Sequence, residues 1–420
     1  MSALTDRIRA VVGHPSAAAS HPPSAIHTAA CQDLSALGGG WHDGTYVVER
    51  RYERSARHGR DTVGAIADRL ADAAAHASWF AGGAPARAPF VFFDLETTGL
   101  SGGAGTQAFL IGCATFDADG AFHVRQFVLT STSDEKRMLG AVQGTLQSAG
   151  ALVSFNGKSF DAPVLETRYL FHRLGWAGAA LPHVDVLHPA RRFWAMDDCS
   201  LVSLERHVVG ARRVGDVPGF EIPSRYFQFV RTGDARPLAP VFEHNRLDLL
   251  TLAALAARLL HLARLGPSEA RSAREALALG HVFARAGMES QAREAFERSL
   301  ALCAAPAGAY DPTRIDALRA LALAWRRARQ FDRAAARWHE LLQIRSCPAP
   351  VAREAAEALA IHHEHRVRDL AAAHAFALKG LDDDVAPPAP ARVLWTRAVR
   401  HRLARIERKI AVSASPTLLS

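Results

Sequence analysis

Five residues in three separate segments have the types and the spacing for metal-dependent chemistry. The segments are "VFFDLETTGL" with Asp94 and Glu96, "NGKSFD" with Asp161, and "EHNRLDLL" with His244 and Asp248. Side chains two residues apart on a strand point the same way, and side chains four apart on a helix share a face. An acid pair on a strand is by itself common on solvated surfaces. Three such segments in one chain favour a shared site.

Hydrolysis of a phosphodiester bond with two divalent cations is the chemistry that needs such residues. Mg²⁺ and Mn²⁺ prefer carboxylate oxygens, and two ions about 4 Å apart need several acids to offset their charge. The candidate metal ligands, which are also candidate catalytic residues, are Asp94, Glu96, Asp161 and Asp248. Histidine has an ordinary pKa near neutrality, so His244 is the candidate general base. The alternative for His244 is that it orients Glu96 or a metal-bound water.

Strands and helices alternate around these residues. The patterns predict strands over residues 90–95, 107–117 and 121–130, a helix over 133–150, a strand over 151–156, a helix over 160–175 and a strand over 183–188. Asp185, on the last strand, is expected to bind backbone groups at the strand end rather than a metal. Helices between strands after an opening meander are typical of an α/β domain with a mixed sheet.

The acidic motifs resemble those of a known family. Asp-x-Glu-Thr-Thr-Gly-Leu (94–100), Asn-Gly-Lys-Ser-Phe-Asp (156–161) and Asp248 are similar to the three exonuclease motifs of the DEDD group of ribonuclease H-like proteins. The segments "HVDVLHPARRFW", "DVPGFEIPSRYF" and "EHNRLDLLTL" are similar to the YprB-like bacterial members. The resemblance covers residues 85 to 262. It implies a ribonuclease H-like mixed five-stranded sheet flanked by helices, with four acids that bind two Mg²⁺ or Mn²⁺ ions.

The resemblance also implies contacts with the substrate. Relatives hold the terminal nucleotide just after the first metal ligands, at the positions of Thr97, Thr98, Gly99 and Leu100. One departure concerns the base. Relatives have either a histidine five residues before the last acid or a tyrosine four before it, whereas His244 stands four before Asp248.

Three further residues are candidate contacts of a nucleic-acid strand. Asn156 ends a predicted strand, with a structural role as the alternative, and Arg191 and Arg192 stand beside Phe193 and Trp194 in "ARRFWAMDDCS". Arginines interleaved with aromatic residues can combine phosphate contacts with base stacking. Packing of both aromatic side chains in the core is the alternative.

The chain divides into three parts. Residues 1–84 are expected to be a partly irregular extension with an edge strand over 44–53 and a helix over 62–80, residues 85–265 the nuclease domain, and residues 266–420 an all-helical domain. In the last part, "LGHVFARAGMESQAREAFERSL" and "LALAWRRARQFDRAAARWHELL" share the offsets of tetratricopeptide repeats. Helical hairpins without true repeat geometry are the alternative.

Composition narrows the class of protein. Hydrophobic residues make up 49% and charged residues 22% of the 420 residues, which is typical of a soluble globular chain. The five cysteines are scattered and form no CxxC pair, so neither a disulfide framework nor a zinc site is indicated. No uncharged stretch approaches the roughly 18 apolar residues of a membrane span. We therefore expect a cytoplasmic protein without membrane association.

The positive charge is unevenly distributed. Of the net charge of +8, residues 266–420 hold +7, because they contain 24 Lys and Arg against 17 Asp and Glu. A basic surface of this kind attracts nucleic acid, here expected to be single-stranded ends, although solvated helix faces are the alternative. Tetratricopeptide-type helices also suggest a protein partner.

These observations predict a metal-dependent nuclease, specifically a 3′→5′ exonuclease of DNA or RNA. Endonuclease action would use the same metal ligands, and the sequence does not separate the two. The alternative from another class is a nuclease-like scaffold with weak or no activity that binds nucleic acid or a protein partner through its helices, because a fold does not guarantee an activity.

Overall fold

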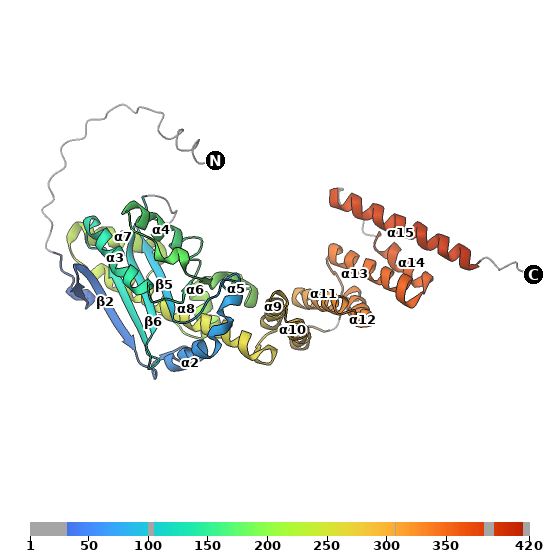
Figure 1. Ribbon diagram of the computed structural model, residues 1–420, viewed down its shortest axis with the longest axis horizontal. Helices are drawn as coiled ribbons and strands as arrows, with labels where there is room; N and C mark the ends of the chain where they lie inside the picture. Colours follow the sequence, from blue (N-terminus) through green and yellow to red (C-terminus); the bar gives the residue numbers. More distant parts are fainter. Residues whose placement is uncertain (1–31, 100–104, 307, 382–389, 415–420) are drawn as a thin grey trace, which may run out of the picture.

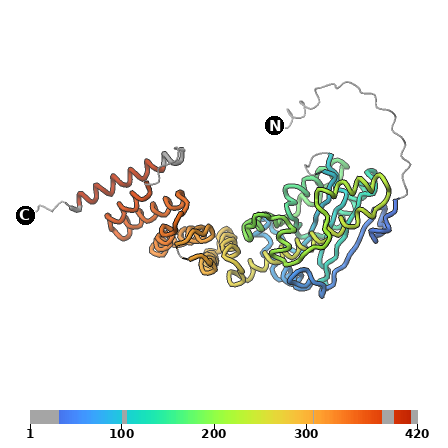
Figure 2. Tube along the Cα trace, turned by 180° about the vertical axis from the view of Figure 1, so that it is seen from behind, coloured from blue at the N-terminus to red at the C-terminus, as the bar shows by residue number. Residues whose placement is uncertain are grey.

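The computed structural model of the protein describes residues 32–99, 105–306, 308–381 and 390–414. An α/β domain and a row of helices follow one another along an elongated molecule (Figure 1, Figure 2). Two parts of the sequence analysis lie outside the described residues: the start of the N-terminal extension, residues 1–31, and the candidate substrate contact Leu100.

A seven-stranded mixed sheet forms the centre of the α/β domain. Its strands are β1 (Gly40–His42), β2 (Thr45–Tyr52), β5 (Phe90–Thr97), β6 (Ala108–Phe116), β7 (Phe122–Val128), β8 (Ala151–Ser154) and β9 (His183–Asp185), in the order β1-β2-β7-β6-β5-β8-β9. β5 is antiparallel to β6 and parallel to β8, and β8 is parallel to β9. The five strands expected from residue 90 onward are all present, which confirms the mixed α/β sheet.

The N-terminal extension adds two strands to this sheet. The prediction of an edge strand over residues 44–53 is wrong, because β2 pairs with β7 on one side and with β1 on the other. Residues 45–48 of β2 are buried, so their backbone N–H and C=O groups need partners on both sides. A short separate hairpin of β3 (Arg57–His58) and β4 (Asp61–Thr62) leads into the helix α2 (Val63–Ala73).

Helices cover both faces of the sheet. One face packs against α3 (Glu135–Leu146), α4 (Asp161–Phe171) and α7 (Ile222–Thr232), and the other against α2 and the long helix α8 (Ala239–Leu265). In β5, Phe93 and Leu95 pack on the face covered by α3, α4 and α7, and Phe92 packs on the face covered by α2 and α8. Because alternate strand residues share a face, Asp94 and Glu96 lie on the Phe92 side, toward α8.

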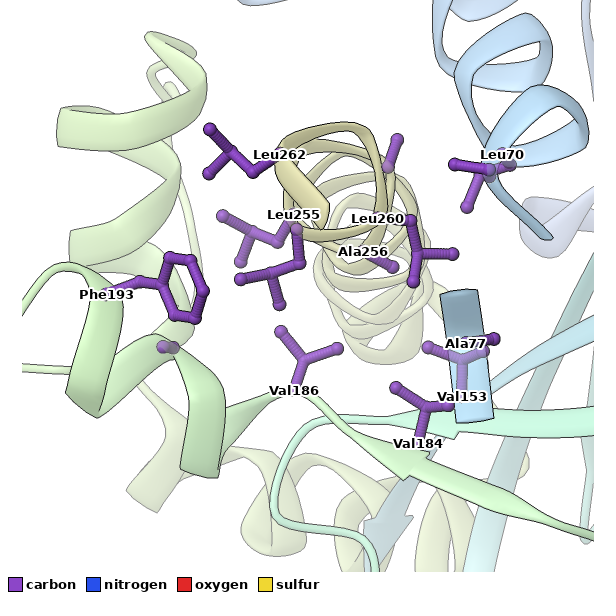
Figure 3. Packing of buried hydrophobic residues seen from close by; sticks show 14 of the residues in the cluster. Leu70, Ala77, Val153, Val184, Val186, Phe193, Leu255, Ala256, Leu260 and Leu262 are labelled. Atoms are coloured by element: carbon purple, nitrogen blue, oxygen red, sulfur yellow. The ribbon is translucent and has the colours of Figure 1, made fainter. Parts of the chain in front are cut away.

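α8 is the central packing element of its face. Figure 3 shows Leu255 and Leu262 of this helix on the side of Phe193, and Leu260 on the side of Leu70 and Ala77. Phe193 ends the helix α5 (Leu187–Phe193), which is followed by α6 (Leu201–Leu204) and a π-helical turn, η5 (Glu205–Val209). The apolar residues run almost all round α8, as expected for a helix that is buried on most sides.

The row of helices begins after Gly266. It consists of α9 (Ala273–Arg285), α10 (Glu289–Leu302), α11 (Pro312–Arg327), α12 (Phe331–Leu342), α13 (Ala349–His362), α14 (Leu370–Lys379) and α15 (Pro390–Ala414). Each helix packs on the next one in sequence. Gly280 of α9 lies under the ring of Phe296 of α10, where a Cβ would come within 2.4 Å of the ring. Both residues lie in the first of the two segments that share the offsets of tetratricopeptide repeats.

Within the residues that the structure describes, no helix is both long enough and apolar enough to cross a lipid bilayer.

Candidate metal centre

β5 delivers two carboxyl groups to the face covered by α8. Burial raises the pKa of Asp94 well above its ordinary range, and the charges of Asp248, Glu96 and Asp161 raise it further. Burial also raises the pKa of Glu96, together with the charges of Asp248 and Asp161. Each of these acids therefore lies close enough to the others for their charges to interact strongly.

Asp161 reaches the same place from the first turn of α4. It is 6% exposed, and burial together with the charge of Asp185 raises its pKa to about 7. The turn before it is tight: Asn156 adopts a left-handed φ of 65°, and a Cβ on Gly157 would lie 2.3 Å from the Ser154 hydroxyl. This turn carries the chain from the end of β8 to the buried carboxyl group.

Asp248 completes the acid site, by which we mean Asp94, Glu96, Asp161 and Asp248. It lies on α8 and is 9% exposed. Burial raises its pKa, whereas the charges of Arg213 and His244 lower it. The structure thus brings together all four acids that the sequence singled out, from β5, α4 and α8.

An arginine that the sequence analysis did not single out contacts this site. The side chain of Arg213 is only 4% exposed, and its guanidinium donates to Asp248 and, at 2.7 Å, to Glu205. Glu205 is itself fixed by a hydrogen bond from the Thr251 hydroxyl. The guanidinium therefore has a buried anchor of its own and neutralises part of the charge on Asp248.

His244 lies beside Asp248, as the four-residue spacing predicts. Its Nε2 is 3.4 Å from Asp248 Oδ2, and its Nδ1 is 2.7 Å from Asp216 Oδ1. Asp216 comes from the segment "DVPGFEIPSRYF", which the sequence analysis quoted without assigning a role to the acid. Asp216 fixes the ring so that Nε2 faces the acid site.

Asn245 connects the acid site to the sheet. Its amide donates to the Asp94 carboxylate at 2.8 Å and to the Asp94 backbone carbonyl at 3.2 Å, and its oxygen accepts a bond from Gln126 at 2.9 Å. Asn245 follows His244 directly, but a single asparagine in a helix gives no signal of such a role. Only the observed closeness of α8 to β5 and β6 reveals it.

The other candidate residues are spread around the acid site. Thr97 and Thr98 bond within their own turn: the Thr97 hydroxyl donates to the Gly99 carbonyl at 2.8 Å, and the Thr98 hydroxyl accepts from the Gln107 backbone at 3.1 Å. This turn leaves β5 at a bulge between Glu96 and Thr97. Thr97, Thr98 and Gly99 are therefore held in place directly after two of the four acids.

Asp185 has the structural role expected from the sequence. Its carboxylate accepts hydrogen bonds from the backbone N–H groups of Asn156 at 2.8 Å, Lys158 at 3.1 Å and Leu187 at 3.1 Å. It therefore fixes the turn between β8 and α4.

Asn156 and the two candidate arginines lie on the surface beside this turn. Asn156 and Arg191 line one cavity of about 860 Å³, and Arg192 is exposed next to Arg191 on α5. Phe193 is 1% exposed in the core, and the indole N–H of Trp194 donates to Glu275 at 3.0 Å. Core packing and a structural hydrogen bond therefore account for both aromatic side chains, and the arginines remain available.

The donor set of the acid site fits a hard divalent cation. As the side chains stand, no three His, Cys, Asp or Glu residues of the described part already form a metal-binding arrangement. Nevertheless the donors are all carboxylate oxygens, and Glu96 and Asp161 accept no hydrogen bond from any described residue. Buried carboxylates that repel one another and lack partners are stabilised in their ionised form by a cation.

Comparison with known proteins identifies the family. Residues 91–260 match the model of the RNase_H superfamily, so the fold and the acid site define a ribonuclease H-like protein. The chain is 31% identical over 329 residues to "Uncharacterized protein YprB" of Bacillus subtilis (strain 168), an alignment that covers 76% of this chain and 74% of that protein. The chain therefore belongs to the YprB-like family of ribonuclease H-like proteins.

Proposed function

We propose that the protein is a metal-dependent nuclease that removes nucleotides from the 3′ end of a DNA or RNA strand with two Mg²⁺ or Mn²⁺ ions. The observation that carries this proposal is the convergence of Asp94, Glu96, Asp161 and Asp248 from three elements, with Glu96 and Asp161 lacking hydrogen-bond partners among the described residues. Membership of a superfamily whose members act on nucleic acids supports it.

Each residue has a defined part in this proposal. The four acids hold the cations, and when bound these supply positive charge to the scissile phosphate and to the attacking water. His244 accepts a proton at Nε2, and Asp216 holds the ring in the orientation that presents this atom. The backbone of Thr97, Thr98 and Gly99, which directly follows Asp94 and Glu96 in the chain, would contact the terminal nucleotide.

The decisive test uses single strands of DNA and RNA labelled at one end or the other. Wild-type protein with Mn²⁺ or Mg²⁺ is expected to shorten the strand stepwise from the 3′ end and to spare a circular strand. Asp94→Asn is expected to lower the rate by about a thousandfold, because it removes a ligand that positions the charge at the reacting phosphate. Asp68→Asn, at an exposed surface pair with Arg54, serves as the matched control.

The outcomes separate the possible activities. Cleavage of the circle would assign endonuclease action to the same acids. Intact strands with wild-type protein across metals, pH and both nucleic acids would overturn the proposal, as would equal cleavage by Asp94→Asn.

The ion pair of Arg213 with Asp248 favours a second candidate function, a nuclease-like scaffold without activity. A guanidinium already supplies positive charge to one of the four acids, so this acid is less free to bind a cation. Such a scaffold would bind nucleic acid or a protein partner through its helices. Intact strands together with no shift of the melting temperature on addition of Mn²⁺ would favour the scaffold over the nuclease.

A further inference from the structure

Basic side chains from three helices gather where the α/β domain meets the row of helices. α5 packs on α9, and the Arg274 guanidinium on α9 donates to the backbone carbonyl of Arg192 on α5 at 3.0 Å. Figure 1 shows α5 at the end of the α/β domain that adjoins α9 and α10. Arg192 of one domain is therefore held beside the arginines of the other.

These arginines lie close together without acidic partners. Burial and the charge of Arg192 lower the pKa of Arg285, so the two guanidinium groups repel each other. Burial and then the charge of Arg285 lower the pKa of His281. The charge of Asp316 opposes this shift, and those of Arg192 and Arg274 add to it. Within the described residues, neither Arg192 nor Arg285 forms an ion pair with a carboxylate. An anion at this point would relieve the repulsion.

A hollow lies beside the repelling arginines. It has a volume of about 460 Å³, and its charged or titratable lining consists of His281, Arg285, Asp316, Arg319 and Arg327. Arg319 is engaged by Glu354 at 2.5 Å, and Asp316 adds one negative charge. Arg285 and Arg327 remain as exposed cations of the hollow, so its charge favours an anion.

A second cavity lies beside α5 in the α/β domain. Arg191, the neighbour of Arg192 on α5, lines this cavity together with Asn156. Asn156 begins the turn that leads to Asp161. Asp197 and Asp198 also line the cavity, so its positive charge is confined to the α5 side.

We propose that Arg191, Arg192, Arg285 and Arg327 form a groove, the junction groove, that binds the phosphate backbone of the nucleic-acid strand whose end lies at the acid site. The identity of the ligand rests on the proposed function. Asn156, which lines a cavity with Arg191, begins the turn that leads to Asp161 of the acid site, and this favours a strand over an acidic protein segment. Because Phe193 and Trp194 face inward, the contacts are with phosphates, and binding is independent of base sequence.

The test measures binding with catalysis silenced. A fluorescent oligothymidine or oligouridine strand is titrated with the full-length protein in EDTA, and anisotropy gives the dissociation constant at several salt concentrations. The double variant Arg192→Gln/Arg285→Gln is expected to bind about tenfold more weakly near 0.15 M salt. The slope of log K against log salt is expected to fall by about 1.4, since each lost phosphate contact on a single strand contributes about 0.7.

A matched control removes the same charge elsewhere. Arg397→Gln/Arg400→Gln takes two exposed arginines from α15, at the other end of the molecule in Figure 1, and is expected to retain wild-type affinity and slope. Arg327→Gln tests the far end of the groove and is expected to lower the slope by about 0.7. Melting temperatures check that each variant is folded.

The outcomes distinguish this inference from the proposed function. Weak binding by the groove variants without any hydrolysis by wild-type protein would keep the groove and overturn the nuclease. Hydrolysis by wild-type protein together with unchanged affinity and salt slope in the groove variants would overturn the groove alone. Equal losses in the groove and α15 variants would also overturn it, because they would show a diffuse effect of net charge.

Discussion

The guanidinium of Arg213 is the most informative single side chain near the acid site. It is held by Glu205 from the buried side and reaches Asp248 on the other, so it stabilises the fold while it neutralises a candidate metal ligand. A cation that binds Asp248 must therefore compete with the arginine or share the carboxylate with it. This competition makes Arg213 a residue whose removal should affect stability and metal affinity in opposite directions.

We expect Arg213→Met to lower the free energy of unfolding by about 3 kcal/mol at neutral pH, because breaking a buried ion pair leaves Glu205 without its partner. The same variant is expected to bind Mn²⁺ more tightly, because Asp248 is freed. Urea unfolding and isothermal titration with Mn²⁺ measure the two effects. Arg212→Met, at the exposed neighbouring position, should change neither. Weaker Mn²⁺ binding by Arg213→Met would show that the arginine supports the cation instead of competing with it.

For single residues, the sequence predicted the acids of the site but not the side chains that contact them. Asp94 and Glu96 follow from strand alternation, and His244 and Asp248 from helical spacing, so their common orientation is a local property. Arg213 lies in an irregular loop, and its position depends on how that loop packs on α8. Local patterns do not encode such a contact.

At the level of elements, the site depends on the close approach of β6 to α8. Gly112 of β6 faces Asn245, and a Cβ at this position would lie 2.2 Å from the Asn245 oxygen and 2.9 Å from Leu249. Because Asn245 holds Asp94, the glycine lets the helix approach near enough to orient the carboxylate.

Gly112→Ala is expected to cost about 2 kcal/mol of stability, as overpacking of a core does, and to lower the affinity for Mn²⁺ by displacing Asn245. Gly140→Ala is the control. This glycine is exposed on α3 with nothing near its Cβ position, so alanine should stabilise the helix by up to about 1 kcal/mol. Chemical denaturation and Mn²⁺ titration of both variants check the prediction. Unchanged Mn²⁺ affinity in a destabilised Gly112→Ala protein would separate packing from the orientation of Asp94.

A buried carboxylate is one of the groups that attach α15 to the preceding helices, beside an apolar cluster. Glu364 lies in the π-helical turn η9 (His363–Val367), and its side chain is inaccessible to solvent and accepts bonds from Arg405 and Lys409. Burial opposes ionisation of Glu364, but the hydrogen bonds from Arg405 and Lys409 outweigh it and hold the pKa at about 2. The folded pKa is thus below the ordinary value of 4.5.

This depressed pKa fixes the sign of a pH effect. The ionised contact contributes fully above about pH 4.5 and is lost as the pH falls toward 2, because protonation then favours the unfolded chain. Glu364→Gln is expected to be about 2 kcal/mol less stable than wild type at pH 7, with a gap that narrows as the pH falls. Hydrogen exchange of α15 measures the gap. Glu407→Gln, at a 60% exposed side chain, should leave it unchanged. A gap that is constant with pH would contradict the assignment.

Element prediction succeeded where the pattern was local. Every strand from β5 to β9 and the described helices after Gly266 follow from periodicity. The neighbours of β2 do not follow from periodicity. An inner strand and an edge strand differ only in their partner strands, and β7, one partner of β2, is distant in the sequence. α5 begins at Leu187, so the predicted strand over 183–188 ends after three residues, at β9.

In the whole molecule, one buried acid ties the two domains together. Glu275 of α9 accepts hydrogen bonds from Arg258 of α8 at 2.8 Å, from Trp194 at 3.0 Å and from the backbone of Arg271 at 2.7 Å. Two of these partners belong to the α/β domain, so the contact sets the position of α9 against it. Local patterns do not predict this contact, because Trp194 and Arg258 are distant from Glu275 in the chain.

Glu275→Ala is expected to destabilise the protein by about 3 kcal/mol, because Arg258 remains buried without its counter-ion. The elongated shape should also become variable, which small-angle scattering detects as a broader distribution of distances. Glu297→Ala, at an exposed position of α10, should preserve both stability and shape. A Glu275→Ala protein that scatters like wild type would place the rigidity of the junction elsewhere.

The length of α8 has a consequence for how such proteins diversify. Asp248 lies in the first half of this uninterrupted helix, and Arg258 lies ten residues on in the second half, about 15 Å away at the helical rise. This one helix therefore contributes a residue to the acid site and another to the contact with α9. A recombination event that exchanges the helical half between family members keeps the acid site intact if its crossover falls beyond Gly266, but the incoming half must then supply an acid at the position of Glu275 to meet Arg258.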